Sequence, residues 1–145
     1  MSDMREKSAG FLKKNSGTLL AAAVALLTAL VLFAGGVRAD VGEDALRVSA
    51  FLAAPISVRY DDIRAARLVE DFDEGQRLSG LRGARVLAGR YLNDDLGGYA
   101  LYAYDGTPVC IDLSTGEGHV VVSLSNEEKT RALYEALLDK LPDIP

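Results

Sequence analysis

The chain of 145 residues is long enough for one domain of ordinary size and a short additional segment, and its hydrophobic content of 49% can supply a core. Residues 1–37 hold four of the 16 basic and two of the 21 acidic residues, which leaves 12 basic and 19 acidic residues in the remainder. An acidic body repels phosphate backbones and so disfavours nucleic-acid binding. The single cysteine, Cys110, excludes an intramolecular disulfide and a zinc site built on several thiolates.

An apolar run over residues 17–37 lies between Lys14 and Arg38 and contains no charged residue. Because a helix of about 20 residues spans the roughly 30 Å hydrocarbon core of a bilayer, the run predicts a transmembrane helix over residues 17–37, after a short basic segment, residues 1–16. A signal peptide cleaved after Ala39 is the alternative, although its apolar region is ordinarily shorter, about 7–15 residues. The preceding basic residues predict a single-pass protein of the cell membrane with a cytoplasmic N-terminus and an extracytoplasmic domain.

Residues 43–145 alternate apolar and polar side chains in short segments separated by turn residues, which is typical of half-buried strands. An Asp-Gly pair, Asp105-Gly106, predicts a hairpin between the fifth and sixth strands. Gly89 is expected to mark a bulge or a close approach of two backbones. The glycine-rich stretch 73–84 is expected to form a loop. Strands are expected over residues 45–52, 56–63, 65–72, 84–92, 98–104, 109–114 and 119–124.

Near the C-terminus the apolar spacing changes to that of a helix. Ser125 and Glu128 are spaced as a capping box, and Pro142 ends the pattern. The fold class expected is therefore mainly β with one C-terminal α-helix: a two-sheet sandwich or partly closed barrel whose open end the helix fills. The apolar face of the helix consists of Tyr134, Leu137, Leu138 and Leu141.

Several short motifs follow one another in residues 43–141: Tyr60-Asp61-Asp62-Ile63, Arg77-x-x-Gly80, Gly89 before Tyr91, Gly98-Tyr99-x-Leu101-Tyr102, Pro108 before an apolar strand, and Thr130 before Tyr134. In their order and spacing the chain resembles the bacterial pleckstrin-homology-like (PH) domain family, found in small membrane-anchored proteins. The resemblance implies a PH-like sandwich of two packed antiparallel sheets with a C-terminal helix over residues 43–145. It implies no catalytic residues and no cofactor.

Two residues are candidates for chemistry. His119 has no partner at a suggestive spacing, and Cys110 lies between apolar residues, so an ordinary strand histidine and a packed thiol are expected. We therefore predict no catalytic residue, metal ligand or cofactor, and expect the protein not to be an enzyme.

Two stretches are candidates for contact with a partner. Four arginines, Arg77, Arg82, Arg85 and Arg90, could form one surface, or could instead pair with nearby carboxylates on a solvated surface. The second stretch, residues 49–57, is apolar and contains no charged residue, which disfavours phosphoinositide binding there. Its contact residues are Phe51, Leu52 and Ile56.

Together these features predict a membrane-anchored, non-catalytic interaction domain, which scaffolds or regulates a protein partner through such a surface or through a sheet edge. The alternative is a small-ligand sensor or carrier. In that case a pocket at the mouth of the barrel would be lined by Tyr91, Tyr99, Tyr102 and Tyr104.

Overall fold

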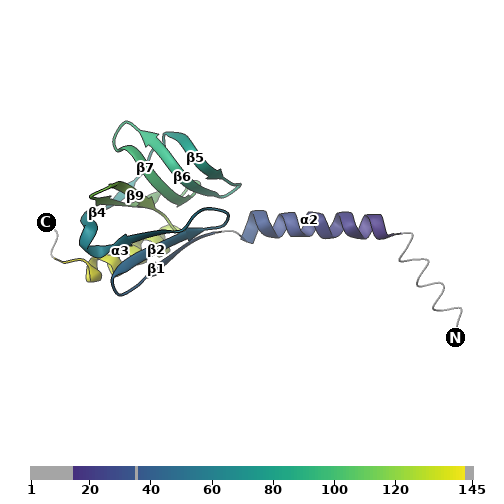
Figure 1. Ribbon diagram of the computed structural model, residues 1–145, viewed down its shortest axis with the longest axis horizontal. Coiled ribbons are helices and arrows are strands. Elements are labelled where there is room, and N and C mark those ends of the chain that lie inside the picture. Colours follow the sequence, from purple (N-terminus) through teal and green to yellow (C-terminus); the bar gives the residue numbers. More distant parts are fainter. Residues whose placement is uncertain (1–14, 35, 143–145) are drawn as a thin grey trace, which may run out of the picture. The chain divides into compact units, whose positions relative to one another are not determined.

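The computed structural model describes residues 15–34 and 36–142, with residues 29–34 described by their backbone alone. The chain divides into two compact units, Met1–Ala34 and Gly35–Pro145. In the first unit, helix α2 (Ser16–Ala34; Figure 1) carries no charged residue. Its side chains Leu19, Leu20 and Leu27 are exposed. Within the described part of the chain, no helix is both long enough and apolar enough to qualify as a membrane span.

The prediction of a transmembrane helix over residues 17–37 is therefore not supported, and the helix is shorter than that range. Helix α2 ends at Ala34, whereas Val37 begins strand β1 (Val37–Val41), where its side chain is buried. The sequence Gly35-Gly36 favours this break because glycine has a low helix propensity. The second unit accordingly starts before the expected residue 43.

The described residues of the second unit form two sheets and one helix. The small sheet is antiparallel in the order β1-β2-β3, so that β2 (Ala45–Ala50) is central and β3 (Ile56–Arg59) is an edge strand. A 3-10 turn, η1 (Tyr60–Asp62), leads from β3 into the large sheet.

The large sheet has the strand order β4-β8-β9-β7-β6-β5, and all neighbours are antiparallel except β7 and β9, which are parallel. The mainly β class with two sheets and a C-terminal helix is thus confirmed. The wholly antiparallel arrangement that the resemblance implies is wrong at this one pair. The strands are β4 (Ile63–Glu70), β5 (Gln76–Arg82), β6 (Val86–Asn93), β7 (Gly97–Tyr104), β8 (Val109–Thr115) and β9 (Gly118–Val122).

Two local predictions are wrong. The Asp105-Gly106 turn reverses the chain, but β7 and β8 do not pair as a hairpin because β9 lies between them and pairs with both. The stretch 73–84, expected to be a loop, contains strand β5 at the edge of the large sheet. Since β5 is exposed along nearly its whole length, it lacks the apolar alternation that would have revealed it.

The large sheet carries a hydrophobic core on each face. The larger core lies on what we call the inner face, toward the small sheet and helix α3 (Glu127–Lys140). The smaller core lies on the outer face, where Phe72 from the β4–β5 connection contacts Tyr99 edge to face at a centroid distance of 5.6 Å. Fully buried residues of the larger core include Leu46, Val48, Ile111, Leu113 and Leu137.

Helix α3 closes the larger core by packing against β8, β4 and β1 (Figure 1). Its buried side chains include Leu133 and Leu137. The N-cap is Asn126 and not the predicted Ser125, because the Asn126 side chain accepts a hydrogen bond from the Lys129 N–H at 2.8 Å. Asparagine and serine are equally good caps, so the sequence alone left the start of the helix uncertain by one residue.

Candidate binding groove

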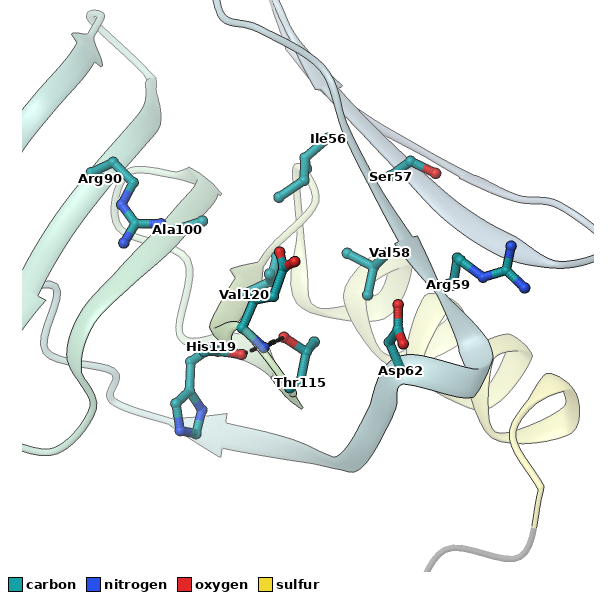
Figure 2. Close-up of a pocket in the computed structure, with 13 residues that line it drawn as sticks. Ile56, Ser57, Val58, Arg59, Asp62, Arg90, Ala100, Thr115, His119 and Val120 are labelled. Atoms are coloured by element: carbon teal, nitrogen blue, oxygen red, sulfur yellow. Dashed lines mark hydrogen bonds between the residues drawn. The ribbon is translucent and has the colours of Figure 1, made fainter.

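A groove lies between the small sheet and the inner face of the large sheet. It consists of two adjoining hollows of about 230 and 510 Å³, which share Ile56, Arg90 and Ala100. The first hollow is lined by every residue of β3 and, opposite them, by residues of the β8–β9 turn, β9, β7 and β6 (Figure 2). The second is lined by the turn between β2 and β3 and by residues of β5, β6 and β7.

Small residues line much of the second hollow. Gly80 and Gly89 are register partners on β5 and β6, and both line the hollow together with Ala88 and Ala100. A Cβ atom on Gly89 would overlap the Ser79 carbonyl oxygen, and the φ of Gly89, 153°, disfavours other residues. The expected close approach of two backbones at Gly89 is therefore confirmed.

The turn between β2 and β3 forms an apolar rim on the groove. Leu52 has a φ of 60°, a conformation that costs a non-glycine residue about 1 kcal/mol or more, and its side chain is 74% exposed. Phe51 beside it is also exposed. The Tyr102 hydroxyl donates a hydrogen bond to the Ala54 carbonyl oxygen at 2.7 Å and so fastens the turn to β7. The fold thus holds an unburied leucine at the edge of a hollow.

The charges of the groove are separated. Figure 2 shows the Arg90 side chain on one side of the first hollow and Asp62 on the other. The Arg59 guanidinium donates a hydrogen bond to a carboxylate oxygen of Asp61 at 2.8 Å, and this hydrogen bond lowers the pKa of the Asp61 carboxyl. Arg90 has no hydrogen-bond or ion-pair partner among the described residues. Its guanidinium therefore remains available to a carboxylate from another molecule.

The predicted contact residues separate in the structure. Arg82 pairs with Glu74 at 3.1 Å, and Arg77 donates to the Gly80 carbonyl oxygen at 3.3 Å. Arg85 lines a different hollow beside the β7–β8 turn. The groove is lined by three of the seven predicted residues: Leu52, Ile56 and Arg90.

The four tyrosines proposed to line a small-ligand pocket do not meet in one cavity. Tyr91 and Tyr99 are fully buried in the outer-face core, whereas Tyr102 lines the groove on the inner face and Tyr104 lines other hollows. Burial raises the pKa of Tyr91, Tyr99 and Tyr102. Their hydroxyls, which are neutral at physiological pH even without burial, therefore lose their protons only at still higher pH.

His119 has a partner that the sequence analysis missed. Its Nδ1 lies 2.7 Å from one oxygen of Asp112, which is 1% exposed, and Arg67 donates to the other oxygen at 2.7 Å. Because a carboxylate only accepts hydrogen bonds, Nδ1 carries the proton. The register of β8 with β9, which pairs Ser114 with His119, places Asp112 on the same face and could have revealed this contact.

This cluster lies away from the groove. Although His119 lines the first hollow with its backbone, Figure 2 shows its ring directed away from that hollow. A buried carboxylate needs such partners, since an unpaired buried charge is strongly destabilising. We therefore assign Arg67, Asp112 and His119 a structural role in joining three strands.

Cys110 lies in the outer-face core and is 4% exposed. Burial raises the pKa of its thiol to about 11. A reactive thiol requires the opposite shift. Cys110 is thus a packed, unreactive residue, as the sequence predicts.

Among the described residues, no group of His, Cys, Asp and Glu side chains is arranged to hold a metal ion. In comparisons with known proteins, the chain matches no family model, no curated protein and no solved structure.

Proposed function

We propose that this protein is a membrane-anchored, non-catalytic domain that binds another protein, and that the groove is its binding surface. The observation that carries the proposal is the unpartnered Arg90 between two hollows whose rim is the exposed apolar turn with Leu52. Exposed apolar surface beside a few polar groups is typical of protein interaction sites.

The polar side chains of the groove favour binding over catalysis. Arg90, Asp62 and Glu117 line the first hollow and offer ion pairs to a partner. The imidazole of His119 is directed away from the groove and is held by Asp112. A carboxylate of the partner fits best where the two hollows join, because the unpartnered Arg90 lies there, whereas Asp62 and Glu117 line the first hollow alone.

The membrane anchor is proposed from the sequence. The stretch between Lys14 and Arg38 contains no charge, and basic residues precede it, which favours a cytoplasmic N-terminus. The alternative of cleavage after Ala39 is disfavoured because Ala39 pairs with Val48 inside the small sheet. Such a cut would remove the first three residues of β1, including the buried Val37.

Site-specific photo-crosslinking in cells tests the groove. We would place the photoreactive residue p-benzoylphenylalanine at Leu52, and, as a matched control, at Leu138, an exposed leucine of α3 outside the groove. We expect a protein adduct from position 52 only. The adduct should be lost with Arg90→Glu and kept with Arg85→Glu, since Arg85 lies outside the groove.

Equal adducts from both positions, or an adduct insensitive to Arg90→Glu, would refute the groove as the binding surface. A small molecule retained by the purified protein and lost with Arg90→Glu would favour the sensor or carrier instead.

The anchor is tested separately by labelling Asp95→Cys in a Cys110→Ser background with a membrane-impermeant maleimide. Labelling of full-length protein on intact cells is expected, and protection until lysis would refute the orientation.

A further inference from the structure

Strand β3 presents an unpaired backbone edge to the groove. It is an edge strand of the small sheet, and all four of its residues line the first hollow. The Tyr60 N–H donates to the Asp44 carbonyl oxygen at 3.0 Å, in the same register that pairs Val58 with Leu46. Because successive strand residues point their backbone groups in opposite directions, the N–H and C=O groups of Ser57 and Arg59 point to the free edge.

The side chains of β3 divide in a way that suits a neighbouring strand. Ile56 and Val58 are directed toward the hollow, whereas Ser57 and Arg59 are directed away from it (Figure 2). A segment lying along the free edge would therefore hydrogen-bond to the backbone of β3 and cover the apolar floor at Ala100. Four residues of strand span about 13 Å, so the segment can be short.

Charge selects the kind of segment. Arg90 borders both hollows without a partner, so a carboxylate on the added strand would gain a charge-assisted hydrogen bond there. We propose that the groove takes an extended, acidic segment of a protein partner, which adds as a fourth strand to β3 and places a carboxylate against Arg90. This inference rests on the proposed function and specifies its ligand.

The test is a phage-display selection, in which random peptides are panned on the full-length protein in detergent micelles. The peptides have about nine residues, so that they are longer than β3. We expect enrichment of peptides with an acidic residue among β-branched ones. Their affinity should fall about tenfold or more with Arg90→Glu and with Ser57→Pro, which removes an outward N–H from β3.

Two variants are the controls. Arg85→Glu makes the same charge change outside the groove. Ala39→Pro removes an N–H from the free edge of β1, since the Gly42 N–H donates to the Ala45 carbonyl oxygen and fixes the same alternation in that strand. Both controls should change the affinity by less than about twofold. Should Ser57→Pro not fold, amide hydrogen exchange in the unaltered protein replaces it, with slower exchange at Ser57 and Arg59 expected when a selected peptide is added.

Three results of the selection would overturn the inference: no enriched peptide, peptides enriched in basic residues, or peptide binding that neither Arg90→Glu nor Ser57→Pro weakens. Self-association abolished by Arg90→Glu would assign the groove to a second copy of the chain and would also overturn it. If the protein with unaltered Arg90 gives no adduct from position 52 in cells, the proposed function itself is refuted, whereas a failed selection alongside such an adduct refutes only the extended acidic ligand.

Discussion

Two tyrosines of the outer-face core, Tyr91 and Tyr99, should respond in opposite ways to loss of their hydroxyls. Both are fully buried, and their rings lie 6.2 Å apart between centroids. The Tyr99 hydroxyl donates to the Glu74 carbonyl oxygen at 2.5 Å. The Tyr91 hydroxyl has no hydrogen-bond partner among the described residues. The pair thus compares a satisfied with an unsatisfied buried hydroxyl in one core.

The expected magnitudes follow from this difference. An unsatisfied buried hydroxyl destabilises the folded state by about 1–3 kcal/mol, and Tyr91→Phe removes this cost. The substitution also loses the van der Waals contacts of one oxygen atom, so the free energy of unfolding should rise by about 1 kcal/mol. Tyr99→Phe keeps the edge-to-face contact with Phe72 but leaves the Glu74 carbonyl without its donor. That change should lower the free energy of unfolding by about 1–2 kcal/mol.

Urea unfolding of the full chain, followed by circular dichroism, measures the free energy of unfolding of both variants. In thermal unfolding, a shift of about 4 °C per kcal/mol is expected. If Tyr91→Phe destabilises the protein as much as Tyr99→Phe does, the Tyr91 hydroxyl has a partner, and our account of the outer-face core is wrong. A change in the denaturant dependence of either variant would instead indicate a change in the surface exposed on unfolding.

Three further predictions concern the framework around the groove. Gly89→Ala should lower the free energy of unfolding by about 3 kcal/mol or more, because the added Cβ atom would overlap the β5 backbone. The control Gly97→Ala should lower it by only about 1 kcal/mol, since Gly97 has a φ of 70° but open space around its Cα atom. Equal losses in urea unfolding would contradict the close approach of β5 and β6. His119→Phe should destabilise the protein by about 1–3 kcal/mol by leaving one oxygen of the buried Asp112 unpaired, and an unchanged midpoint would show that the contact is not needed. The Cys110 thiol should resist maleimide near pH 8 until the protein unfolds. Because burial raises its pKa in the folded protein to about 11, above the ordinary value of 9.0, the unfolded state loses the thiol proton first. The free energy of unfolding should therefore fall as the pH rises between these two values, which unfolding curves at alkaline pH will check.

Most strands with an apolar alternation could be predicted from the sequence, but β1 was missed although its residues alternate, because its first residue fell within the apolar run over residues 17–37. Strands over β2, β3, β6 and β7 were expected because their buried and exposed residues alternate or form long apolar runs. Strand β5 was missed because nearly all of its side chains are exposed, so its sequence shows no alternation of apolar and polar residues. The hairpin between β7 and β8 was wrong because turn chemistry reports only a chain reversal, while the insertion of β9 depends on pairing between distant residues.

The candidate site was predictable only in part, for a related reason. The apolar residues Leu52 and Ile56 and the cation Arg90 each stood out locally, but nothing local distinguished Arg90 from the other three arginines. Its distinction is that the inner face of β6 holds it beside a hollow and away from carboxylates that could pair with it. The contact between His119 and Asp112 did follow from a strand register, yet that register had to be counted across the Gly116–Gly118 turn.

The small residues of the groove argue that it serves binding more than stability. Ala100 borders both hollows and is nearly buried, so a valine there would bury additional methyl groups, each worth about 0.8 kcal/mol where it fits without strain. The chain instead leaves Leu52 exposed at the rim and small residues at the floor. A domain that needed only stability would gain by filling this space, whereas one that accepts a partner's strand must keep it open. Gly80 and Gly89 serve a different purpose, since a Cβ atom on either would overlap the backbone of the other strand, so these two residues let β5 and β6 approach each other.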